Sequence, residues 1–304
     1  MNYKFDFVGK RKLFFLVSGV FLLAGILSLL IAGLNLGIDF VSGTRLDIQI
    51  DEPFTVEQAR DILEQQGIED AQIRVGGNDD NFAIVNVPMT LNNEQVIDIR
   101  EAFQAEYGEQ VDLQEQVVSP VIGRELARNA VIALLLASLG IIIYVAVRFE
   151  YRFAVAAILT LFHDALFTVG MFSILQIEVD LTFIAAVLTI VGYSVNDTIV
   201  IFDRIREHLK VAKIKEFQDL KDVVNVSIQE TLVRSINTGI TVLFTAAVLF
   251  LFGGETIAHF SLALLFGLTI GMYSSIFIAS PLWATWKWAS VQREKKRAAA
   301  AGNS

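Results

Sequence analysis

Six long apolar segments constrain this chain more than any other feature of its sequence. Each is long enough to cross the hydrocarbon core of a bilayer, which takes about 20 residues in a helix. The segments are Leu13–Leu34, Asn129–Val147, Phe153–Leu175, Leu181–Phe202, Ile236–Phe252 and Ile257–Leu282. The low charged fraction of 19% agrees with this interpretation, since soluble domains carry about 25% charged residues. The sequence therefore predicts a polytopic α-helical membrane protein with six transmembrane helices.

The Lys and Arg residues are distributed unevenly around these segments, and their distribution predicts the orientation of the chain. Cytoplasmic loops of membrane proteins carry an excess of basic residues. Eighteen of the 24 Lys and Arg residues fall in parts that a six-span chain places on one side of the membrane. The short links on the other side, Gln176–Asp180 and Gly253–Thr256, contain none. We therefore expect both termini to be cytoplasmic. The expected parts are 1–34 (N-terminus and first transmembrane helix), 35–128 (external domain), 129–288 (transmembrane helices two to six) and 289–304 (basic tail).

Composition excludes several classes of function. The chain has no cysteine, which rules out disulfide bonds and thiolate metal or redox centres. Its net charge of −9 argues against nucleic-acid binding, which requires a basic surface. We expect no cofactor and no bound metal, and contact with a lipid bilayer rather than with nucleic acid.

The external segment between the first two apolar segments has the composition of a soluble domain. Alternating apolar residues indicate strands, and apolar residues at helical spacing indicate helices. The predicted strands are Thr44–Ile50, Ala71–Val75, Phe82–Val87 and Val111–Val118, and the predicted helices are Thr55–Gln66 and Asn92–Tyr107. The order βαββαβ predicts a ferredoxin-like α+β domain, with a turn at residues 76–80. We expect a docking module, with contact to a moving substrate as the alternative, because a fold alone does not fix a function.

Two carboxylates lie inside the apolar segments, where a charge is costly and marks a functional site by default. Asp164 lies at the centre of the third segment, and Thr160 and Thr168 share its helix face. Asp197 lies in the inner half of the fourth segment, and Arg234 precedes the fifth at a depth from which it can approach Asp197. The polar residues expected to surround Asp197 are Tyr193, Ser194, Asn196 and Thr198.

A buried carboxyl group can be neutral in one environment and charged in another, which is what a proton relay requires. For Asp197 this favours a functional role, with Arg234, which does not lose its proton, altering its charge preference. For Asp164, beside His163, a structural helix–helix contact and a place in the proton pathway both remain open. The hydroxyl and amide oxygens near Asp197 also leave Na⁺ open as the coupling ion.

Several motifs in order along the chain resemble those of SecF, the smaller membrane subunit of the SecDF protein-export complex. The resemblance covers nearly the whole chain. The first motif, Gly37–Thr44, includes Gly37, Asp39, Phe40, Gly43 and Thr44. The remaining motifs are Val118–Gly123, Phe149–Arg152, His163–Asp164, Gly192–Glu207, Thr231–Arg234 and Phe252–Gly254. Ser42 and Ser119 stand where the family usually has Gly, which puts the backbone geometry at both positions in question.

The resemblance implies a non-enzymatic subunit that uses the proton motive force to assist protein translocation across the bacterial inner membrane. The family's essential carboxylate matches Asp197 and its essential arginine matches Arg234. The implied partners are SecD, in a pseudo-symmetric assembly resembling resistance-nodulation-division (RND) transporters, the SecYEG channel, often YajC, and a translocating unfolded polypeptide. The external domain would then be periplasmic.

Two other classes of function compete with this interpretation. An intramembrane aspartyl protease could use Asp164 and Asp197 as a proton-sharing pair, although the Gly-x-Gly-Asp signature of that class is absent. A small-molecule efflux subunit of the RND type would normally carry large porter domains, for which 304 residues leave no room.

Overall fold

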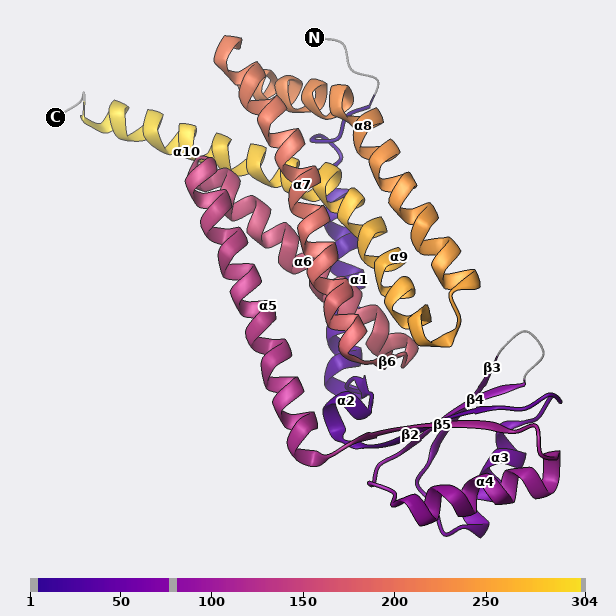
Figure 1. Cartoon of the computed structure of the whole chain (residues 1–304). Coiled ribbons are helices and arrows are strands. Elements are labelled where there is room, and N and C mark those ends of the chain that lie inside the picture. Colours follow the sequence, from indigo (N-terminus) through magenta and orange to yellow (C-terminus); the bar gives the residue numbers. More distant parts are fainter. Residues whose placement is uncertain (1–4, 77–80, 302–304) are drawn as a thin grey trace.

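Residues 5–76 and 81–301 are described in the computed structural model of this chain, with side chains throughout these ranges except at 255–256 and 294–301. Long helices form a bundle, and a smaller α/β domain lies at one end of it (Figure 1). Both ends of the chain lie at the opposite end of the bundle. Because side chains are not described at 294–301, only part of the basic tail expected at 289–304 can be examined. Lys4 lies outside the described residues.

Among the described residues, six helices are long and apolar enough to cross a membrane, which confirms the prediction of six spans. The first five are α1 (Arg11–Ile31), α5 (Pro120–Arg148), α6 (Tyr151–Leu175), α7 (Leu181–Val211) and α8 (Phe217–Phe252). The sixth combines α9 (Glu255–Ser274), a π-helical turn (Ser275–Ala279) and α10 (Ser280–Ala301).

Several of these helices extend beyond the apolar segments from which they were predicted. Helix α5 begins at Pro120 rather than Asn129, because Ser119 caps its N-terminus through Ile122 N and proline is well placed in the first turn. Helix α7 continues through its charged end to Val211, and α8 begins at Phe217, well before the apolar run. Hydropathy marks the part of a helix that suits lipid, whereas capping residues mark where the helix starts and stops.

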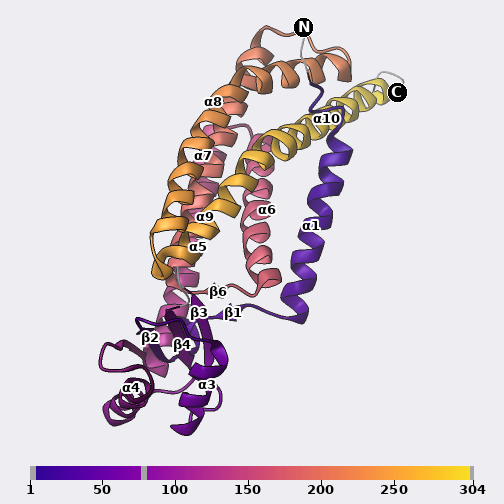
Figure 2. The ribbon, with the colours of Figure 1, turned by 90° about the vertical axis from the view of Figure 1, so that its right-hand side faces the viewer.

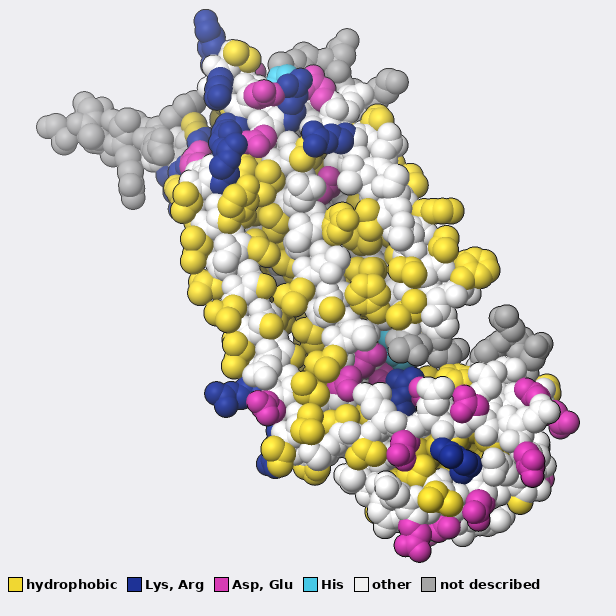
Figure 3. Space-filling view, viewed as in Figure 1, with side chains coloured by type: hydrophobic (Ala, Val, Ile, Leu, Met, Phe, Trp, Pro, Cys, Tyr) yellow, Lys and Arg dark blue, Asp and Glu magenta, His cyan; other side chains and the backbone are white. Residues whose placement is uncertain are grey.

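Helices α6, α7 and α9 form the centre of the bundle, and α1, α5 and α8 lie around them with much of their surface uncovered (Figures 1 and 2). Figure 3 shows apolar side chains over the middle of the bundle, and Lys and Arg gathered at the end where the termini lie. The small residues spaced along α9 allow close packing. A Cβ added at Gly267 would meet Ile190 Cδ1 of α7 at 2.1 Å.

The α/β domain has the predicted order of strands and helices. It comprises β2 (Gly43–Gln49), α3 (Val56–Gln65), β3 (Gln72–Gly76), β4 (Phe82–Val87), α4 (Asn93–Tyr107) and β5 (Asp112–Val118). The antiparallel sheet has the order β3-β4-β2-β5, and its core includes Leu46, Val85, Ile99 and Phe103. Capping boxes at Thr55 and Asn92 start α3 and α4. Apart from Gly76, the turn predicted at 76–80 lies outside the described residues.

A small second sheet joins two parts of the bundle at the end that carries the α/β domain. It pairs β1 (Asn35–Leu36), which follows α1, with β6 (Glu178–Val179) of the α6–α7 link, in parallel register. The four-residue helix α2 (Ile38–Val41) then leads into β2. Sequence patterns did not predict β1 and β6, since two-residue strands are too short to show a period.

Candidate functional site

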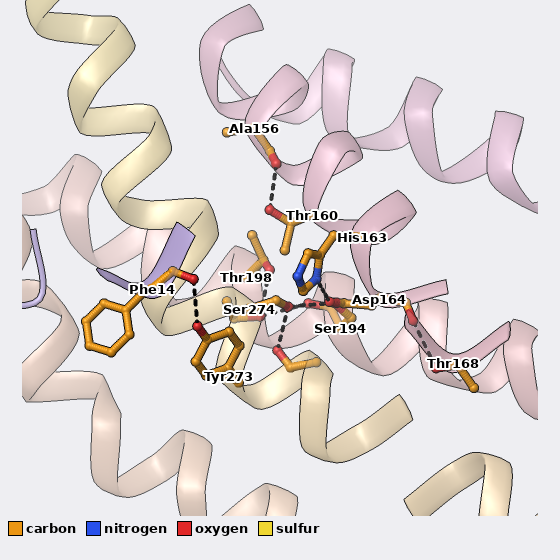
Figure 4. A network of polar contacts seen from close by, with 12 residues as sticks. Phe14, Ala156, Thr160, His163, Asp164, Thr168, Ser194, Thr198, Tyr273 and Ser274 are labelled. Atoms are coloured by element: carbon orange, nitrogen blue, oxygen red, sulfur yellow. Dashed lines mark hydrogen bonds and ion pairs between the residues drawn. The ribbon is translucent and has the colours of Figure 1, made fainter. Parts of the chain in front are cut away.

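Asp164 is completely buried at the centre of the bundle and is held by side chains from three helices. Ser194 Oγ of α7 and Ser274 Oγ of α9 donate hydrogen bonds to Asp164 Oδ2, at 2.5 and 2.7 Å. His163 Nδ1, on the same helix as Asp164, lies 2.8 Å from Oδ1 (Figure 4). The carboxylate therefore joins α6, α7 and α9 through a network of short hydrogen bonds.

The two threonines predicted to share the face of Asp164 are also fully buried. Thr160 donates to Ala156 O and Thr168 donates to Asp164 O, both one helical turn back. Their hydroxyl groups are thus satisfied within α6 and make no bond to the carboxylate (Figure 4). This confirms the shared face, and among the described residues the side chains that bond the Asp164 carboxylate are those of His163, Ser194 and Ser274.

Asp197 is half-buried and lies beside a cavity of about 120 Å³ between α7, α8 and α9. Tyr193, Asn196 and Asp197 line its α7 side, Arg234 and Ser235 its α8 side, and Gly267 and Gly271 its α9 side. We call this space the Asp197 cavity. It brings together Asp197, Arg234, Asn196 and Tyr193, which are four of the five residues predicted for a proton pathway.

The carboxylate of Asp197 is only partly satisfied. Ser235 and Ser275 lie beside it and the charge of Arg234 acts on it, yet Oδ2 is buried without a hydrogen-bond partner among the described residues. In the described part of the chain, Arg234 and Asp197 line one cavity without forming a direct ion pair. A buried polar atom that lacks a partner is costly, so this oxygen is suited to receive a proton, water or cation.

Two of the residues expected around Asp197 face another way. Ser194 donates to Asp164, and Thr198 Oγ1 lies 2.8 Å from Ser275 Oγ. The reason is helical geometry: positions 194 and 198 share one face of α7, directed at α6 and α9, whereas 193 and 197 share the neighbouring face. Ser194 thus lines the wall of the Asp197 cavity, as expected, with its hydroxyl bonded to Asp164, whereas the hydroxyl of Thr198 pairs with Ser275.

Ser194 and Gly271 separate the two carboxylates. A Cβ added at Gly271 would lie 3.4 Å from Ser194 Cβ and 3.8 Å from Asp164 Oδ2, so the absence of a side chain there brings Asp164 close to the cavity wall. Sequence analysis missed the contribution of Ser274 and Ser275. Their position at the π-helical turn lets Ser274 donate to Asp164 and brings the Ser275 hydroxyl against Thr198 of α7, and such turns occur frequently at functional sites.

The Gly37–Thr44 motif lies at the other end of the bundle, away from these carboxylates. Asp39 Oδ2 accepts a hydrogen bond from Leu181 N at the start of α7, at 3.0 Å. Thr44 Oγ1 donates to Met89 O and accepts from Leu91 N, and Phe40 packs against the bundle core. This motif thus joins the bundle and the α/β domain.

The two serines in place of the family's glycines have different backbone geometries. Ser42 has φ of +68°, in the left-handed region that favours glycine, whereas Ser119 has an ordinary φ of −69°. The adjacent Gly43 has φ of +142°, and a Cβ there would lie 2.2 Å from Val87 O. The departure therefore carries strain at Ser42 and none at Ser119.

Buried carboxylates and a cation beside a cavity in an apolar bundle define a polytopic membrane protein with an ionisable intramembrane site. No group of three or more His, Cys, Asp or Glu side chains suited to a metal occurs in the described residues.

Comparison with known proteins identifies the family. Residues 98–289 match the family described as protein export membrane protein SecD/SecF, C-terminal, and residues 27–53 match the SecD/SecF GG motif.

Individual relatives agree with the family match. Protein translocase subunit SecF of Alicyclobacillus acidocaldarius is 42% identical, and the alignment covers 96% of each chain. Protein translocase subunit SecDF of Bacillus subtilis is 47% identical over 96% of this chain, which spans 39% of that relative. The crystal structure of SecDF from Thermus thermophilus, a translocon-associated membrane protein, superimposes with a TM-score of 0.85 at 36% identity, over 93% of this chain and 38% of that one. The chain belongs to the SecD/SecF protein-export family, and it matches SecF subunits over nearly their whole length.

Proposed function

We propose that this chain is a SecF-like subunit that uses the proton motive force to assist protein translocation across the bacterial inner membrane. The observation that carries the proposal is the Asp197 cavity, where a half-buried carboxylate with one unsatisfied oxygen faces the fixed positive charge of Arg234. Membership of a family of protein translocase subunits supports the transport role. No catalytic chemistry is required for it.

Protonation of Asp197 would change the charge balance within the cavity. When the carboxylate is ionised, Arg234 is attracted to it, and when it is neutral that attraction is lost. Proton transfer across a membrane releases about 2.3 kcal/mol per charge for each 100 mV. This energy would bias α7 and α8, which carry the two groups, between two packing arrangements. Protons are the coupling ion we favour, and Na⁺ is the alternative.

The family likeness supports the assembly and orientation that we propose. SecD is the partner across the uncovered faces of the bundle, and the pair acts on a polypeptide emerging from SecYEG, often with YajC. Both termini lie in the cytoplasm, where the basic residues gather. The α/β domain, whose strand order β3-β4-β2-β5 is that of a ferredoxin-like fold, is then periplasmic.

The arrangement gives less support to an aspartyl protease. Asp164 Oδ2 is engaged by Ser194 and Ser274, and Oδ1 by His163. A catalytic pair would instead share a proton between its two carboxyl groups, and no hydrogen bond joins Asp164 to Asp197 among the described residues. A purified complex is expected to cleave no membrane-spanning substrate.

The proposal is tested by export into inverted membrane vesicles that contain the assembled complex, with and without a proton gradient. Asp197→Asn is expected to abolish the stimulation by the gradient and to leave the complex assembled. Asp203→Asn is the matched control, because Asp203 lies on the same helix but outside the cavity, near Arg148 and Arg206. Full stimulation of the Asp197→Asn complex would refute the proposal.

A further inference from the structure

One face of the sheet in the α/β domain carries charged residues and faces the helical bundle. Side chains alternate along a strand, so Leu46 and Val85 enter the core beneath α3 and α4, whereas Asp47, Arg74 and Ile84 lie on the other face. Ile84 is only 4% exposed although it lies opposite the helices. In Figure 1 the helices α3 and α4 lie on the side of the sheet away from the bundle.

Arg74 on this face forms an ion pair with Glu178 of the bundle. Arg74 Nη1 lies 3.2 Å from Glu178 Oε2, and the Glu178 side chain is 3% exposed. Gly37 makes room for this carboxylate, since a Cβ there would lie 2.5 Å from Glu178 Oε1. Glu178 Oε2 makes no hydrogen bond among the described residues, so the charge of Arg74 is its principal compensation.

Glu178 lies immediately before the helix that carries Asp197. It belongs to β6, and α7 begins at Leu181, whose backbone N–H is held by Asp39. Asp180 caps the same helix through Phe183 N, at 2.8 Å. The covalent connections of the α/β domain, in contrast, lead to α1 and α5, neither of which contributes a residue to the Asp197 cavity.

Other charged groups surround the pair. The charges of Arg74, Arg45, Glu178 and Asp180 all act on His259 of α9, so the charged groups of the sheet face and of the α6–α7 link lie near one another. Arg45 is itself paired with Asp47 of its own strand, at 2.7 Å. The Arg74–Glu178 ion pair is the one that crosses from the α/β domain to the bundle in the described residues.

We propose that the Arg74–Glu178 pair couples α7 to the α/β domain, so that a movement of α7 caused by a change of charge at Asp197 changes the position of that domain. This coupling rests on the proposed function of Asp197. Separating the pair leaves a buried, uncompensated carboxylate, which is strongly unfavourable. The domain therefore follows the start of α7 rather than moving independently on its two linkers.

Because the chain has no cysteine, spin labels can be attached at introduced cysteines and the domain position followed by pulsed electron spin resonance. Suitable exposed positions are Glu64 on α3 and Phe162 on α6, a helix that carries neither Asp197 nor Arg234. In the complex with the SecD partner, Asp197→Asn is expected to shift the distance distribution between the labels. The shift is expected to disappear when Glu178→Gln or Arg74→Gln is added, and to persist with Arg74→Lys, which keeps the charge.

Export provides the second readout. Glu178→Gln and Arg74→Gln are expected to reduce gradient-driven export roughly 2- to 30-fold, the range for substitutions within a coupling network, while export without a gradient is unchanged. Arg60→Gln, on the helical layer of the same domain, is the matched control and is expected to behave as wild type. A distance shift that is unaffected by Glu178→Gln, or no shift from Asp197→Asn, would overturn the coupling. The proposed function itself fails separately, if Asp197→Asn leaves gradient-driven export intact.

Discussion

Removing one hydrogen bond at a time from Asp164 distinguishes a charged from a neutral carboxyl group at the centre of the bundle. Ser274→Ala deletes the 2.7 Å bond to Oδ2 and leaves those from Ser194 and His163 in place. A hydrogen bond to a charged group contributes about 1.5–3 kcal/mol, whereas side-chain hydrogen bonds between membrane helices average about 0.6 kcal/mol. The cost of the substitution therefore reports the charge of Asp164.

We expect Ser274→Ala to cost about 1.5–3 kcal/mol, because hydrogen bonds from His163, Ser194 and Ser274 converge on one carboxylate. Ser274 also bonds Gly271 O, a contact that Ser274→Ala removes whatever residue stands at 164. The double variant Asp164→Asn/Ser274→Ala corrects for it, because the coupling between the two sites isolates the bond to the carboxylate. The assay is equilibrium unfolding of the purified chain in detergent micelles. A coupling energy near 0.6 kcal/mol or below would refute an ionised Asp164 with three effective hydrogen bonds.

Three further predictions concern single residues: Ser42, Asp6 and Asp164. Ser42→Gly is expected to stabilise the chain by about 1 kcal/mol in the same unfolding assay, since glycine adopts the observed φ of +68° without the backbone strain of serine. Gly43→Ala should lower the stability well below that of the wild type, because the added Cβ would clash with Val87 O. Burial raises the pKa of Asp6, but hydrogen bonds from Lys221 and Asn225 outweigh it and the pKa of Asp6 lies below its ordinary value of 3.8. Attachment of the N-terminal segment to α8 is therefore complete above pH 3.8 and weakens as the pH falls through the lower folded-state pKa of Asp6. Hydrogen exchange at the Val8 N–H, which is bonded to Asn225, measures this weakening. An exchange rate at Val8 that does not change with pH, after correction for the intrinsic rate, would contradict the prediction. Asp164→Ala is expected to impair gradient-driven export less than Asp197→Asn does, and equal losses would show that Asp164 belongs to the proton pathway.

Sequence patterns predicted the large features of this fold because each follows from a local rule. An apolar run of sufficient length predicts a membrane-spanning helix, and strand and helix periods predicted the α/β domain. The predictions failed where tertiary pairing decides the structure. Two-residue strands β1 and β6 exist only because they pair with each other, and their sequences carry no signal of it.

The candidate site was predictable in its residues but only partly in its contacts. Asp164, Asp197 and Arg234 were visible as charges in or beside apolar segments, a rule based on the cost of burying charge. Which serine serves which carboxylate depends on the rotation of α7 and on the π-helical turn in the last span. Ser274, which donates to Asp164, and Ser275, which bonds Thr198 close to Asp197, could have been suspected only as adjacent hydroxyls in an otherwise apolar helix.

Proton flux through the reconstituted complex shows whether Asp197 is the group that binds the proton. Liposomes containing the chain with its SecD partner and a translocating polypeptide are given a pH gradient, and its decay is followed with an internal pH-sensitive dye. Asp197→Asn is expected to reduce the protein-dependent flux to the level of empty liposomes, whereas Asp203→Asn retains it. Equal flux through the wild-type and Asp197→Asn complexes would contradict the assignment of Asp197 as the proton-binding group.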